Sequence, residues 1–422
     1  MMLDVSYNEI KGEIIPPPSK SFSQRYILMA SFLPGKKVIW PVGLSDDEKT
    51  AEGIARSCGM SLKRDGETIT IEGNFHCPER LDCGESGTAF RLIMGMLSSR
   101  RCKTAVDVSG RLAQRPLAPL LESLSPHGFI AERNGNSFMV DATIFSSGEP
   151  FVVNPRESSQ FVSALMMALS LQKGGGIIEM NGIPSSGGYI KITSEILRNL
   201  GVQSEFNANR IKISGKLKQM EGTYCNERDF SSSAILISLG LLCSTDGIRI
   251  TGLPSSGLQP DSKILDILKD VININKFGEE IEISCRKVDD IPYFEVDVDK
   301  TPDLAPALSI IGMFSPNGVG LLNPDRLNLK ESKRFDAILE IAKKLNSIVE
   351  RTEDLITIKM GKLPDKFHPR DYHDHRMSMA QFVACAALMR KFSFPYTGDM
   401  DKSFPGFLPE MEKCGFHINR LD

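Results

Sequence analysis

A strongly apolar run that follows a short polar or charged turn occurs six times along the chain. The copies read SKSFSQRYILMAS, ESGTAFRLIMGML, SSQFVSALMMALS, DFSSSAILISLG, PDLAPALSIIGM and DHRMSMAQFVACAAL. Equivalent positions are Ser21, Ser86, Ser159, Ser231, Asp303 and Asp374, which lie 65, 73, 72, 72 and 71 residues apart. A pattern that returns at this interval in a chain of 422 residues predicts six structural repeats.

A second, amphipathic segment follows in each repeat. Apolar residues recur there at three- and four-residue spacing, and most of these segments end at a glycine, which is typical of a helix and its C-terminal cap. These helices are expected within residues 46–59, 115–128, 189–201, 261–271, 332–345 and 404–415. Strand-like runs such as ETITIEG, NRIKISG and DLITIKM lie between the helices. The repeat is therefore predicted to mix helices and strands.

Length and charge narrow the class of protein. The chain is long enough for at least two domains of roughly 200 residues each. Its 53 acidic and 50 basic residues give a net charge of −3, so we expect neither a nucleic acid nor an anionic membrane surface as a partner. No apolar run approaches ~20 residues, and the N-terminal segment lacks the features of a secretory leader. We expect a soluble cytoplasmic protein.

The nine cysteines are odd in number, and none lies in a CxxC arrangement. This usage predicts neither a disulfide framework nor a zinc ribbon, and it favours a reducing compartment.

Cationic residues accompany the polar helix starts. They are Lys20, Arg25, Arg91, Arg115, Lys330, Arg334, Arg376 and Lys402. A helix N-terminus presents unpaired N–H groups, and guanidinium groups bind phosphate and carboxylate groups bidentately. The simpler interpretation is that the polar residues only cap helices. The repeated combination with cations favours a site for a small molecule that carries several negative charges.

Two carboxylates lie among these cations. Glu331 stands between Lys330 and Arg334, and Asp303 lies at a predicted helix start. Both are candidates for proton transfer, although Glu331 can equally be an ion-pair partner and Asp303 a helix cap. The histidines of the HDH run lack the spacing of a HExxH site, so we expect no metal.

Eight motifs occur in an order and spacing that resemble the 5-enolpyruvylshikimate-3-phosphate synthase family of enolpyruvyl transferases. They are PPPSKSFSQR, CGESGTAFR, LAQRP, SSQF, SSGGYIKIT, LKESKR, DHRM and DKSFP. The resemblance implies an α/β fold, a two-domain inverted α/β barrel of six βαβαββ repeats with three in each domain. It implies one discontinuous domain of residues 1–19 plus 229–422, a second of residues 20–228, and an active site in the cleft between them.

The implied reaction is transfer of the enolpyruvyl group of phosphoenolpyruvate to the 5-hydroxyl of shikimate 3-phosphate, by addition and elimination, on the route to chorismate. No cofactor and no metal is implied, and we expect a monomer. The catalytic groups implied by the motifs are Asp303, Glu331 and Lys20. The resemblance leaves open which of the three performs each proton transfer.

The resemblance also divides the binding residues between the two substrates. Those implied for shikimate 3-phosphate are Lys20, Ser21, Arg25, Ser158, Ser159, Gln160, Ser186, Tyr189, Asp303 and Lys330. Those implied for phosphoenolpyruvate are Lys20, Gly87, Arg115, Gln160, Arg334, Arg376 and Lys402.

Several positions depart from the family pattern, among them Pro18, Glu85 and Lys333. They leave the inhibitor response and the kinetic constants open. Three alternatives also stay open: a transferase that acts on UDP-N-acetylglucosamine, an RNA-end-processing protein built on related repeats, and a non-catalytic copy that only binds an anion.

Overall fold

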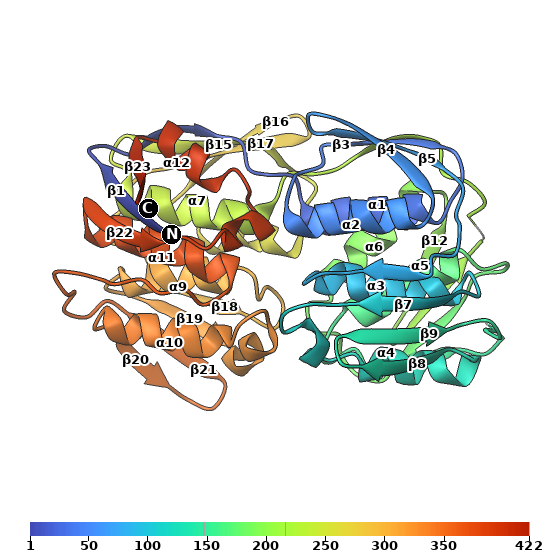
Figure 1. Cartoon of the computed structure of the whole chain (residues 1–422). Coiled ribbons are helices and arrows are strands. Elements are labelled where there is room, and N and C mark those ends of the chain that lie inside the picture. Colours follow the sequence, from blue (N-terminus) through green and yellow to red (C-terminus); the bar gives the residue numbers. More distant parts are fainter. Residues whose placement is uncertain (147, 216, 422) are drawn as a thin grey trace. The chain divides into compact units, whose positions relative to one another are not determined.

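The computed structural model describes residues 1–146, 148–215 and 217–421, and the chain separates into two compact units (Figure 1). Unit 1 comprises Met1–Pro17 and Arg228–Asp422, and unit 2 is the continuous segment Pro18–Glu227. The changes between units lie close to the boundaries expected after Ser19 and Arg228. The assignment of those two positions as domain boundaries stays a prediction.

One repeat of unit 2 shows the βαβαββ order without interruption. Its elements are β6 (Arg80–Asp82), α3 (Gly87–Ser98), β7 (Lys103–Asp107), α4 (Ala118–Leu124), β8 (Ile130–Asn134) and β9 (Ser137–Asp141). The sheet order is β6-β7-β9-β8, with β6 and β7 parallel and the other neighbours antiparallel. The parallel strands β6 and β7 are joined by a helical crossover, whereas the consecutive antiparallel strands β8 and β9 form a hairpin.

The next repeat follows the same plan. It contains β10 (Phe151–Val153), α5 (Gln160–Ser170), β11 (Gly176–Met180), α6 (Gly188–Asn199), β12 (Gln203–Asn207) and β13 (Arg210–Ser214), with sheet order β10-β11-β13-β12.

The remaining repeat of unit 2 is completed by a distant strand. It contains α1 (Lys20–Ser31), β3 (Lys36–Trp40), α2 (Asp46–Ser57), β4 (Met60–Asp65) and β5 (Thr68–Gly73). Its parallel edge strand is β14 (Gly222–Cys225), which pairs with β3 about 185 residues away in the chain.

Unit 1 is built from the same repeat. One sheet, β18-β19-β21-β20, belongs to the continuous repeat β18 (Phe294–Asp297), α9 (Ala305–Met313), β19 (Val319–Leu322), α10 (Arg334–Lys344), β20 (Ile348–Arg351) and β21 (Leu355–Lys359). A second sheet, β16-β17-β15-β2, takes its edge strand β2 (Lys11–Ile14) from the N-terminal segment. Its other elements are α7 (Phe230–Cys243), β15 (Gly247–Pro254), α8 (Ile264–Ile267), β16 (Asn273–Phe277) and β17 (Glu280–Cys285).

The last repeat combines both ends of the chain. It contains α11 (His375–Leu388), β22 (Lys391–Pro395), α12 (Phe407–Lys413), β23 (Phe416–Leu421) and β1 (Met2–Tyr7). The three-stranded sheet has the order β22-β1-β23, so β1 takes the place that the final strand holds in the other repeats (Figure 1).

The two helices of a repeat are buried differently. The first helix is apolar on nearly every side, and all ten residues that follow Gln160 in α5 are buried. The second helix is amphipathic, and α6 buries one stripe that includes Ile190, Thr193 and Leu197. The first helix therefore lies in the core of its unit, whereas the second covers it.

The predicted second helices are confirmed, except that the one in residues 261–271 is short. A 3₁₀ turn at Pro260–Lys263 precedes α8, which has only four residues. Asp261 lies in this turn, and its side chain points inward and accepts a hydrogen bond from the Ser231 hydroxyl at 2.5 Å. No helix of the described residues is long and apolar enough to cross a membrane.

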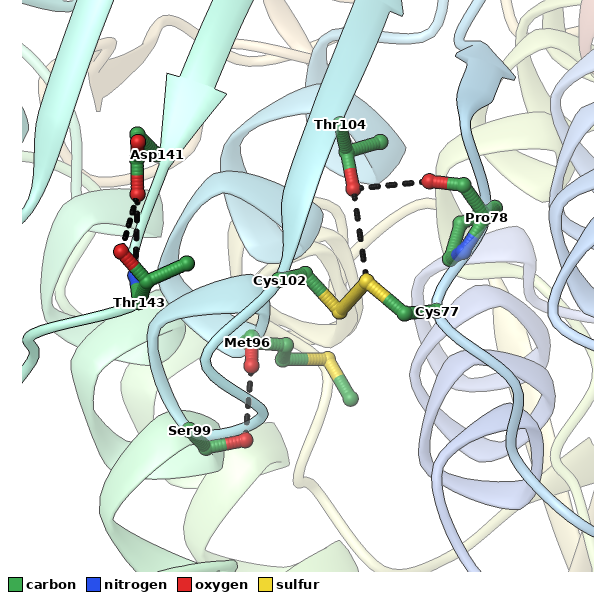
Figure 2. Close-up of a disulfide and its surroundings, with 8 residues drawn as sticks. All are labelled: Cys77, Pro78, Met96, Ser99, Cys102, Thr104, Asp141 and Thr143. Carbon is green, nitrogen blue, oxygen red and sulfur yellow. Dashed lines mark hydrogen bonds between the residues drawn. A yellow bond between two sulfur atoms is a disulfide. The ribbon is translucent and has the colours of Figure 1, made fainter.

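The expectation for the cysteines was wrong for one pair, because Cys77 and Cys102 form a disulfide (Figure 2). Strands β6 and β7 are parallel with Arg80 opposite Ala105. Each cysteine precedes its paired residue by three positions, so the register of the strands places the two sulfur atoms side by side. Spacing along the sequence does not reveal this register.

Candidate active site

In unit 2, buried polar side chains join the helices near their first turns. The Ser86 hydroxyl, at the N-cap of α3, donates to Gln24 Oε1 of α1 at 3.2 Å. Arg25 of α1 is 1% exposed, and its Nε donates to Thr193 Oγ1 of α6 at 2.8 Å. Its NH1 donates to the Ser21 carbonyl at 2.7 Å. These contacts connect α1 to α3 and to α6.

Gln160, the first residue of α5, connects that helix to α3. Its Oε1 accepts a hydrogen bond from Arg91 NH1 at 2.7 Å, and its Nε2 donates to Thr88 Oγ1 at 2.8 Å. Its backbone N–H donates to the Ser158 hydroxyl at 3.2 Å. Ser159 is the buried N-cap residue of the same helix. The predicted residues Ser158, Ser159 and Gln160 are therefore adjacent at one helix start.

Lys20, the first residue of α1, forms an ion pair with the first turn of α2. Its Nζ lies 2.8 Å from Asp47 Oδ2, and both side chains are largely buried. The start of α1 is held by Asn226, whose Nδ2 donates to the carbonyl of the N-cap residue Ser19 at 3.3 Å and to Ser23 Oγ at 2.8 Å. A residue from the far end of unit 2 thus contacts the start of the helix to which Lys20 belongs.

Gly87 begins α3 and lies against the guanidinium group of Arg115. A Cβ atom at position 87 would stand 2.8 Å from Arg115 NH1, closer than normal contact. The structure therefore brings together these two predicted residues, and the absence of a side chain at Gly87 permits the approach.

Ser186 and Tyr189 lie at the start of α6. Ser186 is buried and adopts a left-handed backbone conformation with φ of 52°, which is uncommon for a residue other than glycine. Its carbonyl accepts the N–H of Tyr189 at 3.1 Å.

In unit 1, the buried guanidinium group of Arg334 holds three carboxylates. NH1 lies 3.0 Å from Asp303 Oδ1, NH2 lies 2.9 Å from Glu331 Oε2, and Nε lies 3.1 Å from Asp374 Oδ2. Burial lowers the pKa of Arg334, but the charges of Asp374, Glu331 and Asp303 raise it above its ordinary value. Arg334 is therefore a permanent cation at the centre of an ionic cluster.

Asp303 contacts two further cations. Its Oδ2 lies 3.2 Å from Arg376 NH2, and its Oδ1 lies 3.8 Å from Lys330 Nζ. Burial raises the pKa of Asp303, but the charges of Arg376, Lys330 and Arg334 together hold it well below its usual range. Asp303 is ionised at neutral pH. It does not cap α9, whose N-cap is Leu304.

Two acidic residues of this cluster received no functional role from the sequence. Asp374 is fully buried, caps α11 by accepting the N–H groups of Arg376 and Met377, and accepts the Ser332 hydroxyl at 3.0 Å. Asp261 is 3% exposed, and burial together with the charge of Asp303 raises its pKa to about 6. The position of Asp374 two residues before Arg376 could have indicated its role, whereas no feature of the sequence around Asp261 pointed to a buried carboxylate.

The remaining predicted residues lie near the surface of unit 1. Lys402 ends a 3₁₀ turn at Asp399–Lys402 and is half-buried, as is Lys330. Of the two histidines, His373 is exposed and its Nδ1 lies 2.9 Å from Asp371, whereas His375 is buried at the start of α11. Within the described part of the chain, no group of three or more His, Cys, Asp or Glu side chains is arranged to hold a metal ion.

Comparison with known proteins places the chain in one family. The sequence model of EPSP synthase (3-phosphoshikimate 1-carboxyvinyltransferase) matches residues 6–411. A 3-phosphoshikimate 1-carboxyvinyltransferase of Picrophilus torridus is 36% identical over 411 residues, which cover 96% of this chain and 97% of that relative. One of Thermoplasma volcanium is 37% identical over 417 residues, or 98% of each chain. Matches of this extent define an enzyme of the transferase class. The chain belongs to the EPSP synthase family.

Solved structures show the same fold. An EPSP synthase of Acinetobacter baumannii matches with a TM-score of 0.81 at 20% identity, over 99% of this chain and 100% of that one. An enolpyruvyl transferase of Streptomyces tendae matches with a TM-score of 0.74 at 15% identity, over 99% and 98% of the two chains. The predicted fold class, an inverted α/β barrel of six βαβαββ repeats, is confirmed.

Proposed function

We propose that the chain transfers the enolpyruvyl group of phosphoenolpyruvate to the 5-hydroxyl of shikimate 3-phosphate and releases inorganic phosphate. Membership of the EPSP synthase family supports the reaction. The observation that carries the proposal is the cluster in which Asp303 and Glu331 share the buried guanidinium group of Arg334. It combines proton-transfer groups with fixed positive charge, and the reaction needs both.

The chemistry proceeds by addition and elimination. A proton is added to C3 of phosphoenolpyruvate, and the 5-hydroxyl oxygen attacks C2 as it gives up its own proton. The tetrahedral intermediate then loses phosphate from C2 and a proton from C3, which restores the double bond. Electrostatic stabilisation of the anionic groups and fixed orientation of the two substrates are the largest contributions expected.

Asp303 is assigned as the acceptor of the hydroxyl proton. It is ionised, as a base must be, but its three cationic partners make it a weak base in the structure described here. When the phosphate and carboxylate groups of phosphoenolpyruvate bind Arg334 and Arg376, they compensate part of this positive charge. The pKa of Asp303 then rises, so the base gains strength only after its substrate has bound.

Glu331 and Lys20 are assigned to the proton transfers at C3 and at the leaving phosphate. Glu331 lies 2.9 Å from Arg334 NH2, and Lys20 Nζ lies 2.8 Å from Asp47 Oδ2. Each lies within ion-pair distance of an oppositely charged neighbour, which orients the group.

We assign the substrate contacts as the resemblance to the family implies. Phosphoenolpyruvate is assigned to Lys20, Gly87, Arg115, Gln160, Arg334, Arg376 and Lys402. Shikimate 3-phosphate is assigned to Lys20, Ser21, Arg25, Ser158, Ser159, Gln160, Ser186, Tyr189, Asp303 and Lys330. The proposal includes a monomer in the cytoplasm.

The test is phosphate release from phosphoenolpyruvate without added metal, with shikimate 3-phosphate and UDP-N-acetylglucosamine offered in parallel as acceptors. Release that depends on shikimate 3-phosphate alone is the expected result. Release only with the nucleotide sugar would assign the other acceptor. No release with either acceptor, from a chain that is folded by circular dichroism, would contradict catalysis.

A further inference from the structure

Arg25 is a buried cation without an ionic partner. Its two hydrogen bonds go to the neutral oxygens of Thr193 and Ser21. No carboxylate of the described residues forms an ion pair with it, and burial lowers its pKa to about 10. A charge removed from water is costly unless an opposite charge compensates it. This guanidinium group is therefore suited to a bound anion, in agreement with its assignment to shikimate 3-phosphate.

The direction in which Arg25 presents its remaining N–H groups depends on Thr193. A guanidinium group is planar and has five N–H donors in a fixed fork. Two of these donors are engaged, one on Nε by Thr193 Oγ1 at 2.8 Å and one on NH1 by the Ser21 carbonyl at 2.7 Å. Two contacts to different atoms of one rigid plane define its orientation, and the other donors stay available to a ligand.

The Thr193 hydroxyl has a short hydrogen bond of its own to a neighbouring helix. Thr193 is fully buried in α6, and its hydroxyl donates to Ser163 Oγ of α5 at 2.8 Å. With its hydrogen directed at Ser163, the hydroxyl presents a lone pair to Arg25 Nε. A chain of hydrogen bonds from Arg25 through Thr193 to Ser163 thus crosses α1, α6 and α5. Such chains polarise and strengthen their members.

We propose that Thr193 is a positioning residue for shikimate 3-phosphate, which it serves by fixing the plane of the Arg25 guanidinium group, with Ser163 as its support. This inference rests on the proposed function, because it takes the anion bound by Arg25 to be that substrate. Thr193 itself makes no contact with the ligand in this proposal. Its hydroxyl acts through Arg25 alone.

The decisive variant is Thr193→Val, which keeps the shape of the side chain and removes the hydroxyl. We expect the Kd for shikimate 3-phosphate, measured by calorimetry without phosphoenolpyruvate, to rise about tenfold, the size typical of one lost hydrogen bond to a charged group. KM for shikimate 3-phosphate should rise by the same factor. The values of kcat and of KM for phosphoenolpyruvate should stay within about twofold, because Arg25 is assigned only to the other substrate.

Two further variants grade the effect. Thr193→Ser restores the hydroxyl and should recover most of the affinity for shikimate 3-phosphate. Ser163→Ala should weaken binding only about threefold, because the Thr193 hydroxyl can turn to the Tyr189 carbonyl at 3.3 Å, a longer and weaker bond. These two variants keep the test decisive if Thr193→Val does not fold.

Thr104→Val is the matched control. Thr104 is a buried threonine of β7 in the same unit, and its hydroxyl donates to the Pro78 carbonyl at 2.9 Å (Figure 2). It has no bond to a residue assigned to a substrate. Its loss of thermal stability should resemble that of Thr193→Val, with the Kd for shikimate 3-phosphate unchanged.

A Thr193→Val chain that binds shikimate 3-phosphate within twofold of the parent overturns the positioning role and leaves the proposed function intact. Equal weakening in Thr104→Val also overturns it, since the effect would then be general destabilisation. A folded parent chain that binds no shikimate 3-phosphate overturns the proposed function, and this inference with it.

Discussion

The two units hold their candidate residues in place by different means. In unit 1, Arg334 joins Asp303, Glu331 and Asp374 in ion pairs. In unit 2, many of the links between helices use neutral groups, such as the bond from Thr193 to Ser163. Both arrangements lie in the N-terminal halves of helices, in repeats of the same βαβαββ kind. One repeat therefore supports both a charged and a largely neutral scaffold.

The difference has a chemical meaning. The cations of unit 1 are compensated from within, so an anionic ligand must share them with carboxylates that are already bound. Arg25 of unit 2 has only neutral partners, so an anion supplies its first opposite charge. Binding of an anion in unit 1 therefore changes the pKa of carboxylates that are already there. Binding of an anion at Arg25 instead compensates a buried positive charge that has no other ionic partner among the described residues.

The sharpest test of the charged scaffold is removal of its proton-transfer groups. Asp303→Asn or Glu331→Gln should lower kcat by about 10²–10⁴-fold, the usual range for general acid–base catalysis. The affinity for shikimate 3-phosphate should stay nearly unchanged in Glu331→Gln. In Asp303→Asn it should fall much less than kcat, because Asp303 is assigned to this substrate and the amide keeps the shape of its side chain. Steady-state kinetics and calorimetry measure the two quantities.

Asp325→Asn is the control for these variants, since Asp325 forms an exposed ion pair with Arg351 in the same unit. It should leave turnover unaffected. A kcat within about twofold of the parent would remove Asp303 or Glu331 from its assigned role.

Replacement of one arginine in each unit compares the scaffolds directly. Arg334→Met should lower the free energy of unfolding by about 3–5 kcal/mol, because it leaves buried carboxylates without their cation. Arg25→Met should change it by no more than about 1 kcal/mol, because removal of an uncompensated buried charge offsets the loss of its hydrogen bonds to two neutral acceptors. Denaturant titrations at pH 7, followed by circular dichroism, measure both. Equal losses for the two variants would show that the scaffolds do not differ in this way.

Asp261 permits a comparison by pH. Its folded-state pKa is raised to about 6 from 3.8, so the protonated form stabilises the fold at low pH. This contribution is fully present below about pH 4 and is lost as the pH rises through about 6. The amide of Asp261→Asn does not ionise, so this variant should keep the free energy of unfolding that the parent loses. Relative to the parent, its free energy of unfolding should rise by up to about 3 kcal/mol between pH 4 and pH 7. Unfolding titrations across this range would contradict the idea if the difference between the two chains stayed constant.

The smallest effect is expected at the start of α3. Gly87→Ala adds a Cβ only 2.8 Å from Arg115 NH1, so the guanidinium group must move. KM for phosphoenolpyruvate should rise about tenfold, the cost of a weakened charged hydrogen bond, with binding of shikimate 3-phosphate retained. Gly53→Ala in α2 is the control, because nothing lies within 4 Å of its new Cβ. An equal KM for phosphoenolpyruvate in the two variants would contradict the idea that Gly87 leaves room for the Arg115 guanidinium group.

Apolar periodicity predicted the repeats and their helices, because each first helix is buried on most sides and each second helix on one. It could not predict which strands complete each sheet. The pairing of β14 with β3 joins residues far apart in the sequence, and the disulfide between Cys77 and Cys102 depends on a strand register.

The charged motifs identified Asp303, Glu331 and Arg334, because a carboxylate among cations is visible in the sequence. Thr193 and Asp261 were missed for a physical reason. A threonine on the apolar stripe of an amphipathic helix is interpreted from sequence as a packing residue. The role of the Thr193 hydroxyl becomes visible only from its hydrogen bond with Arg25, which lies on another helix. Asp261 reads as a surface residue before a helix, although the fold turns it inward.

The permuted repeats set an order for biosynthesis. Unit 2 is one continuous stretch, so all of its strands have been synthesised once Glu227 leaves the ribosome, and it can fold while the rest of the chain is being made. Strand β1 must wait much longer, because Asp4 pairs with Ser393 and Asn419. A strand translated before unit 2 therefore pairs only after unit 2 has been completed, and the later segment is the first that can become a finished structure.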